Sequence, residues 1–335
     1  MGKMRKKAMA RALGLLALLL CFPAQALALE ASELVPGGDA VGIQLEAGGV
    51  IVAGFSEVHS TDGQTRRPAE DAGIKAGDVI REVGGIRVQS AADFLTAMSA
   101  CDGEALLVRA ARNGQELTFH VTPAKSGDGV WQLGLWLRDA VAGIGTVTFY
   151  DPDTGVFGAL GHGINDLDTG ALLPFETGTI TAAEVVDVIP GAAGSPGELC
   201  GKFDREDIRG TLAKNTERGI FGTAAVAEPG APIPVAGEDE VTLGPATIRS
   251  SVGAEGARDY AVEISRVYRD SEDNRFLLLT VTDAELLART GGIVQGMSGS
   301  PILQNGKLIG AVTHVLLGDP RRGYGISIEK MLEAA

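Results

Sequence analysis

The sequence predicts a mainly β protein with two units, a small α+β domain followed by a larger β-barrel domain. Short runs of Val, Ile and Thr alternate with polar residues, as in half-buried strands. Glycine accounts for 47 of the 335 residues and repeatedly separates these runs, which is typical of tight turns between strands. Apolar residues make up 45% and charged residues 21%, so the chain can build a packed core.

Residues 1–29 have the layout of a secretory signal. The first eleven residues carry five basic side chains and no acidic one, and the apolar run Ala12–Phe22 follows. Overlapping A-x-A patterns within 24–28 then resemble a cleavage site. The run is shorter than the ~20 residues of a membrane span, but it approaches that length when extended to Leu29. We predict export across the cytoplasmic membrane and leave open whether segment 1–29 is removed or kept as an anchor.

Residues 35–125 form the predicted α+β domain, in which each element has a local signal. Alternation indicates strands, Ser90 is a suitable helix N-cap, and Asn113-Gly114 is a hairpin turn signal. In chain order the predicted elements are strands 41–45 and 50–55, a short helix ended by Gly73, two strands on either side of Gly84-Gly85, a helix over 91–100, and a hairpin of 106–110 with 117–121.

The stretch 69–88 resembles a PDZ domain of the bacterial protease-associated type. It reads A-x-x-A-G-I-x-x-G-D-x-I-x-x-V-x-G-x-x-V in outline. The resemblance implies that a peptide C-terminus adds as a strand beside 41–45. Its carboxylate would then meet backbone N–H groups around Val41, Gly42 and Ile43, where small residues leave room. In the alternative reading, this domain only packs against its neighbour.

Residues 131–335 form the predicted second domain, in which short strand signals dominate. Regularly spaced short strands with glycine turns suggest a barrel or a sandwich. A short helical turn is expected near the C-terminus, at 329–333. The strongest strand signals lie at 146–150, 156–160, 260–267, 275–282 and 307–315.

Ser298 is the best candidate nucleophile, in the sequence Gly296-Met297-Ser298-Gly299-Ser300-Pro301. Flanking glycines let the backbone turn sharply and expose both Oγ and successive N–H groups. The N–H groups of Gly296 and Ser298 could then form an oxyanion hole. Ser300 is the alternative nucleophile, although the following proline offers no N–H. An ordinary glycine-rich turn would also fit this sequence.

A nucleophilic serine needs a base, and the chain has four histidines. His59 lies in a polar loop and His120 in a strand of the first domain, so both are interpreted as surface residues. His162 lies between two glycines at a strand end, which is an exposed place for an imidazole. His314 lies 16 residues after Ser298 and could line a substrate cleft or belong to the core.

A base is usually oriented by an acid, and four aspartates are candidates. Asp283 lies 15 residues before Ser298, Asp166 and Asp168 follow His162 closely, and Asp319 follows the strand of His314. Sequence spacing alone does not choose among them, because a charged residue in a loop is usually just solvated.

The second domain resembles the SpoIVB peptidase family, and together with the N-terminal segment and the PDZ domain the likeness covers nearly the whole chain. It implies a trypsin-like serine endopeptidase. Carried over to this sequence, it makes His162 the general base, Asp283 its orienting acid and Ser298 the nucleophile. The matching stretches are 157–164, 193–198, 215–222, 292–302, 306–315 and 323–326.

The resemblance also implies a biological setting. Family members act outside the cytoplasmic membrane, around a developing forespore. They cut themselves and an extracytoplasmic part of a membrane regulator, which releases an intramembrane protease that processes a sigma-factor precursor. The PDZ domain is implicated in self-recognition and regulation. Two rival functions remain: a general envelope quality-control protease of similar layout, and a non-catalytic PDZ adaptor.

Cofactors and nucleic acid have little support in the composition. The net charge of −14 argues against binding nucleic-acid phosphates. No C-x-x-C motif is present, and the serine protease reaction needs neither a metal nor an organic cofactor. Outside segment 1–29, Cys101 and Cys200 are the two cysteines; two free thiols are expected, and one disulfide remains an alternative.

Overall fold

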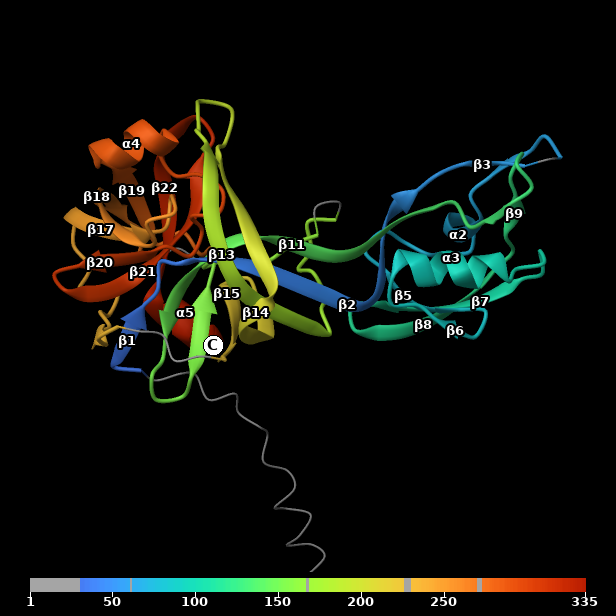
Figure 1. Cartoon of the computed structure of the whole chain (residues 1–335), viewed down its shortest axis with the longest axis horizontal. Coiled ribbons are helices and arrows are strands. Elements are labelled where there is room, and N and C mark those ends of the chain that lie inside the picture. Colours follow the sequence, from blue (N-terminus) through green and yellow to red (C-terminus); the bar gives the residue numbers. More distant parts are fainter. Residues whose placement is uncertain (1–30, 61, 167–168, 226–229, 270–272) are drawn as a thin grey trace, which may run out of the picture.

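A computed structural model describes residues 31–335 except 61, 167–168, 226–229 and 270–272. Two units lie at opposite ends of an elongated molecule, and two long antiparallel strands run between them (Figure 1). These strands are β2 (Ala40–Phe55) and β11 (Leu135–Tyr150), which pair from Leu135 opposite Phe55 to Thr146 opposite Ala40. The predicted signal or anchor, 1–29, lies outside the described residues.

The PDZ unit occupies one end of these two strands. Its core gathers apolar side chains from the strands and from the helix α3 (Ala91–Ser99), such as Val50, Ile80, Phe94 and Val108. Ser90 and Asp93 form a capping box at the start of α3, as the sequence predicts for Ser90. The remaining elements of this unit are β3 (Val58–His59), β4 (Thr65–Arg66), α2 (Pro68–Asp71), β5 (Val79–Val83), β6 (Ile86–Arg87), β7 (Leu106–Arg112), β8 (Gln115–Val121), β9 (Ala124–Lys125) and β10 (Trp131–Gln132).

A larger body occupies the other end, and its first half is part of a twelve-stranded sheet. Eleven of its strands follow the order β16-β1-β11-β12-β15-β14-β13-β2-β5-β7-β8, and the twelfth, β6, pairs with β5 beside this path. The sheet therefore continues through β2 into the PDZ unit. The strands of the first half are β1 (Glu33–Pro36), β12 (Val156–Ala159), β13 (Thr177–Ile189), β14 (Glu198–Thr216), β15 (Gly219–Ala224) and β16 (Ile233–Pro234), together with the body ends of β2 and β11.

The second half of the body is a closed six-stranded barrel, ordered β17-β18-β19-β22-β21-β20. The predicted hairpin of 260–267 and 275–282 is present in it as β18 and β19, with Val262 opposite Val281. Its elements are β17 (Gly244–Ser250), β18 (Arg258–Val267), β19 (Leu277–Val281), α4 (Ala284–Thr290), β20 (Pro301–Gln304), β21 (Lys307–Leu316), β22 (Asp319–Ser327) and α5 (Ile328–Ala334). The prediction of a mainly β chain containing a PDZ domain and a β-barrel is confirmed.

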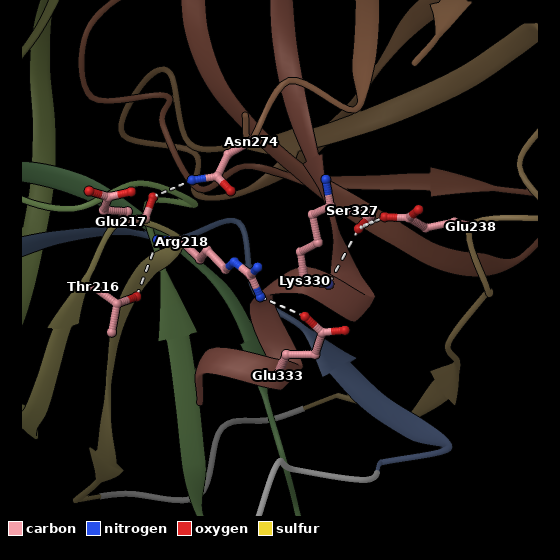
Figure 2. A network of polar contacts seen from close by, with 8 residues as sticks. All are labelled: Thr216, Glu217, Arg218, Glu238, Asn274, Ser327, Lys330 and Glu333. Atoms are coloured by element: carbon pink, nitrogen blue, oxygen red, sulfur yellow. Dashed lines mark hydrogen bonds and ion pairs between the residues drawn. The ribbon is translucent and has the colours of Figure 1, made fainter. Parts of the chain in front are cut away.

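The two halves of the body share a hydrophobic core. One cluster packs Leu34, Phe149 and Phe221 of the sheet against Ile326 and Met331 of the barrel and its terminal helix. Polar contacts of α5 and its surroundings strengthen this junction (Figure 2). The ion pair Arg218–Glu333 measures 2.6 Å, and the Asn274 side-chain amide donates to the Glu217 carbonyl at 2.7 Å. The turn between β14 and β15 is therefore held to the barrel side of the body.

The PDZ unit is inserted between two strands of the body, which differs from the predicted order of one domain over 35–125 and a second over 131–335. Residues 33–36 pair with β11 and β16, and residues 41–46 pair with β11 and β13. These segments thus belong to the body. The local alternation of 41–45 is correct for a strand, but it does not reveal which strands lie beside it.

Within the described residues, no helix combines the length and apolarity of a membrane span.

Candidate active site

Ser298 lies in the loop between α4 and β20, where the chain turns sharply at two glycines. Gly296 and Gly299 have φ angles of 95° and 96°, a region that residues other than glycine rarely adopt. Ser298 is half-buried, and its Oγ donates to the Thr313 carbonyl at 2.7 Å. A nucleophile at this position would leave that carbonyl by rotating about χ1.

The N–H groups of Gly296 and Ser298 have no acceptor among the described residues. Their neighbours differ, because the N–H groups of Gln295 and Met297 donate to carbonyls nearby. The Gln295 carbonyl accepts from the Leu199 N–H of β14 at 2.9 Å. Since N–H and C=O point in opposite directions across a trans peptide, this bond turns the Gly296 N–H away from Leu199. Two N–H donors without an acceptor, beside a half-buried serine, have the character expected of an oxyanion hole.

Ser300, the alternative nucleophile, is fully buried at 0% exposure. Its N–H donates to the Met297 carbonyl at 3.0 Å, and its own carbonyl accepts from the Val312 N–H. The side chain thus faces the interior, where a substrate peptide does not reach. Of the two candidate serines, only Ser298 is accessible.

His162 comes from the other half of the body and follows β12 through a strained turn. Leu160 and Gly161 both have left-handed backbones, with φ angles of 68° and 69°. A left-handed leucine is uncommon, and such strain often occurs at functional sites. The Gly161 Cα lies so close to Thr313 that a Cβ there would be 3.0 Å from the Thr313 Cγ2. His162 and Ser298 are therefore brought to the same stretch of β21 from opposite halves.

The protonation of His162 can be inferred from its contacts. Its Nδ1 lies 2.8 Å from the Gly163 carbonyl, and because a carbonyl only accepts, Nδ1 carries the proton. Nε2 is then left with a lone pair that can take a proton. Burial lowers the pKa of His162 below its ordinary value, while the Gly163 carbonyl opposes this shift. The imidazole is thus neutral at neutral pH, as a general base must be.

His314, on β21, lies beside His162, with ring centroids 5.0 Å apart. Desolvation, and then the charges of His162 and Arg275, lower the pKa of His314 to about 4, although part of the residue is exposed. Its exposure excludes the predicted alternative of a core histidine, and a place in a substrate cleft stays a prediction. His59 and His120 lie in the PDZ unit, far from Ser298 in the fold; His59 contacts the Thr65 hydroxyl at 3.0 Å.

The structure gives Asp283 a different role from the one implied by the family resemblance. Its carboxylate accepts from the Leu286 N–H at 2.9 Å as the N-cap of α4, and also from the Ala261 N–H at 3.3 Å. His162 is hydrogen-bonded to a backbone carbonyl instead. The structure therefore does not bring Asp283 to His162, because the short helix after β19 needs an acceptor for its first N–H groups.

The other candidate acids also have partners of their own. Asp166 is buried, lies 3.2 Å from Arg138 and accepts from Thr169. Asp319 forms an ion pair with Arg321 at 3.0 Å. Asp168 lies outside the described residues. In this structure, the atom that orients His162 is the Gly163 carbonyl oxygen.

The predicted PDZ peptide site at Val41, Gly42 and Ile43 is wrong. These residues are buried in the body, and both edges of their strand are occupied, by β11 on one side and β13 on the other. A strand that is hydrogen-bonded on both edges cannot accept a peptide strand. The Gly42 Cα also faces the Phe203 side chain, which fills the space that a ligand would need.

A different hollow exists in the PDZ unit, between α3 and the segment 130–135. It has a volume of about 400 Å³. Leu95 is 68% exposed beside it, which is unusual for a large apolar side chain. The main contributors to its lining are Phe94, Leu95, Met98, Val130, Trp131 and Leu135.

Metal and thiol chemistry have little support among the described residues. No group of three or more His, Cys, Asp or Glu side chains in these ranges is arranged to hold a metal ion. Cys101 and Cys200 are both free thiols, in the PDZ unit and in β14 respectively.

Comparisons with known proteins match both units. A PDZ domain model matches residues 59–112. "Putative zinc metalloprotease LL2128" of Lactococcus lactis is 34% identical over 90 residues, which are 27% of this chain and 19% of that protein. The HtrA-type protease AlgW with tripeptide has 13% identity and a TM-score of 0.35, over 57% of this chain and 54% of AlgW.

The Rv3671c protease from M. tuberculosis, in its active form, has 15% identity and a TM-score of 0.31, over 56% of this chain and 70% of that one. The chain thus spans about a fifth of the Lactococcus protein and about half of AlgW. The SpoIVB peptidase S55 model matches residues 129–332, which are more than half of the chain. This chain therefore belongs to the SpoIVB peptidase S55 family.

Proposed function

We propose that this protein is an exported serine endopeptidase in which Ser298 is the nucleophile and His162 the general base. The observation that carries the proposal is the meeting of these residues at Thr313 from opposite halves of the body. Family membership supports the same activity. Because the peptidase carries a PDZ unit, we expect its substrates to be proteins or peptides.

The reaction follows from the positions of the groups. Ser298 Oγ rotates from the Thr313 carbonyl toward His162 and transfers its proton to Nε2 as it attacks a peptide carbonyl. The N–H groups of Gly296 and Ser298 receive the oxyanion that develops. The His162 imidazolium then protonates the leaving amine, and water hydrolyses the acyl-enzyme with His162 again as base.

Orientation of His162 by the Gly163 carbonyl has a chemical cost. The carbonyl selects the correct tautomer but carries no full negative charge to stabilise the imidazolium. A resting enzyme of this kind would be slow until a carboxylate or a bound substrate stabilises that charge. This agrees with a peptidase of narrow substrate range, in contrast to a general quality-control protease.

The finer biological assignment rests on the family resemblance. It comprises self-cleavage, cutting of an extracytoplasmic segment of a membrane regulator of an intramembrane protease, and a role in sporulation. The space around the forespore is the location that goes with it. The hollow between α3 and 130–135 is the peptide-binding surface that we propose for the PDZ unit, in place of residues 41–43.

The test is covalent labelling of the protein from residue 29 onward with a fluorophosphonate, alongside self-cleavage read by mass. Ser298→Ala is expected to abolish both, and His162→Ala to slow both by several orders of magnitude. Ser300→Ala separates the two serines, because labelling should persist in it. Labelling that survives Ser298→Ala would overturn the assignment. A chain that stays unlabelled yet binds peptides would favour the adaptor.

A further inference from the structure

Thr146 of β11 is a buried threonine that touches both sides of the candidate active site. It is 0% exposed. Its N–H donates to the Ser298 carbonyl at 3.0 Å, and its Oγ1 donates to the Gly296 carbonyl at 2.8 Å. Its own carbonyl accepts from the Leu160 N–H at 3.2 Å, two residues before His162. One residue thus bonds to the nucleophile loop and to the segment that carries the base.

We propose that Thr146 is a positioning residue of the peptidase reaction. It holds the oxyanion hole and the general base His162 at a fixed position relative to each other. The proposal rests on the proposed function and adds a role that the comparisons do not assign. Thr146 touches no reacting atom; it acts through the backbone of Gly296 and Ser298.

The argument follows four consecutive peptide groups. Because each trans peptide is planar, a bond to its carbonyl also sets the direction of the next N–H. The Gln295 carbonyl is held by Leu199 N–H and the Met297 carbonyl by Ser300 N–H. These two bonds aim the N–H groups of Gly296 and Ser298, which form the proposed oxyanion hole.

Thr146 donates to the other two carbonyls of this run, those of Gly296 and Ser298. All four peptide planes are thereby fixed, two of them by Thr146. Glycine at 296 has no side chain to restrict its own rotation, so this loop depends on external bonds for its shape. Loss of the Thr146 hydroxyl removes the donor to the Gly296 carbonyl, so the peptide plane between the two oxyanion donors keeps only the bond from the Met297 N–H to the Val294 carbonyl, at 3.1 Å.

Gly299 supports the same view independently. A Cβ on Gly299 would lie 2.0 Å from the Thr146 carbonyl oxygen and 2.5 Å from the Leu160 nitrogen. The loop therefore packs directly onto the Thr146–Leu160 hydrogen bond. Because protein interiors are closely packed, a shift of Thr146 would also displace the Ser298 loop.

The test compares Thr146→Val with Thr146→Ser. Valine keeps the shape of threonine but removes the hydroxyl, whereas serine keeps the hydroxyl. Deleting a whole oxyanion donor costs a factor of about 10²–10³ in kcat, so misdirecting the hole should cost roughly 10–100-fold. We expect Thr146→Val to lower kcat by that factor with KM unchanged, and Thr146→Ser to restore most of the rate.

Thr181→Val is the matched control. Thr181 is also buried in the sheet half, and its Oγ1 donates to a backbone carbonyl, that of Gly42, at 3.4 Å. Thermal unfolding of the variants measures the loss of stability from removing a buried hydroxyl. A fall in kcat confined to Thr146→Val, at similar melting temperatures, would support positioning.

A second measurement keeps the proposal testable if Thr146→Val is less stable. A peptide boronic acid forms a tetrahedral adduct that needs the oxyanion hole, whereas the matching product peptide does not. Thr146→Val should weaken the binding of the boronic acid but leave the binding of the product peptide unchanged. Equal rates and affinities in wild-type protein and Thr146→Val would overturn the proposal. Failure of wild-type labelling, or its persistence in Ser298→Ala, would instead refute the proposed function.

Discussion

The PDZ unit and the candidate active site differ in how their residues come together. The PDZ core is assembled almost entirely from the contiguous stretch between β2 and β11, and it is a hydrophobic cluster of its own. The candidate active site gathers Thr146, Leu160 to His162, Ser298 and Thr313, and the first and last of these lie 167 positions apart in the chain. A local unit can be recognised from one motif. A site of this kind depends on pairing between strands that are distant in sequence, so a change in any one of these strands can displace its residues.

Gly299→Ala should have the largest effect, and it acts on the cleft. The new methyl group would lie 2.0 Å from the Thr146 carbonyl oxygen, on a residue whose φ is 96°. We expect loss of fluorophosphonate labelling by at least about 100-fold and a lower melting temperature of the body. Gly306→Ala is the control, because it has a similar φ of 76° but open space around it. Equal behaviour of the two variants would show that the close approach is unimportant.

Arg112→Met should have a large effect confined to the PDZ unit. The buried Asp78 carboxylate accepts two bonds from the Arg112 guanidinium, at 2.6 and 2.7 Å, and this contact raises the pKa of Arg112. Removing one partner of such a pair leaves a buried charge and costs about 3–5 kcal/mol. Hydrogen exchange should rise across 79–121 while labelling of Ser298 changes little.

Arg109→Met provides the control for the PDZ unit, since its contact with Glu82 is exposed and longer, at 3.6 Å. It should change exchange only slightly, because exposed pairs are worth little. A loss of Ser298 labelling in Arg112→Met, absent in Arg109→Met, would mean that the two units are less independent than their separate cores suggest.

Asp283→Asn tests whether Asp283 serves α4 or His162, and it should have a moderate effect on kcat at most. Asparagine is as good an N-cap as aspartate, so α4 and its stability should be retained. On the observed geometry we expect kcat to fall by less than about tenfold. Loss of the orienting acid of a triad costs a factor of about 10⁴. A drop of that size, at unchanged melting temperature, would mean that α4 rearranges to bring Asp283 to His162.

The pH dependence should give the smallest and most specific effect. His162 must be neutral to act as base, and burial lowers its pKa below the ordinary 6.5. Activity is therefore present above that lowered pKa and is lost as pH falls through it, so the acid limb of kcat/KM should lie below pH 6.5. An acid limb at or above 6.5 would show that a negative group stabilises the imidazolium in the working enzyme.

The sequence was sufficient for features with local signals. Ser298 between glycines, His162 at a strand end, the cap at Ser90 and the PDZ motif all stand in short contiguous stretches. The failures are non-local. The alternation of Val41 to Leu45 is the same whether the strand lies at a PDZ edge or between two strands of the body.

Asp283 shows the same limit in another way. An aspartate before a helix can cap it or serve a distant histidine, and only the packing of α4 separates these roles. Thr146 carries no sequence signal either, because a threonine in a strand is common and the partner of its hydroxyl, the Gly296 carbonyl, lies 150 residues away.

The shared strands β2 and β11 set how this protein can be divided by genetic means. A truncation that starts after the PDZ motif would remove β1 and β2 and leave β11 and β13 with exposed edges, which favours aggregation. The natural place to cut is across both strands between the body and the PDZ unit, where Glu46 of β2 lies opposite Ala140 of β11. A two-residue Asn-Gly turn joining them would convert the two long strands into one hairpin. The peptidase body would thereby become a continuous chain without its PDZ unit.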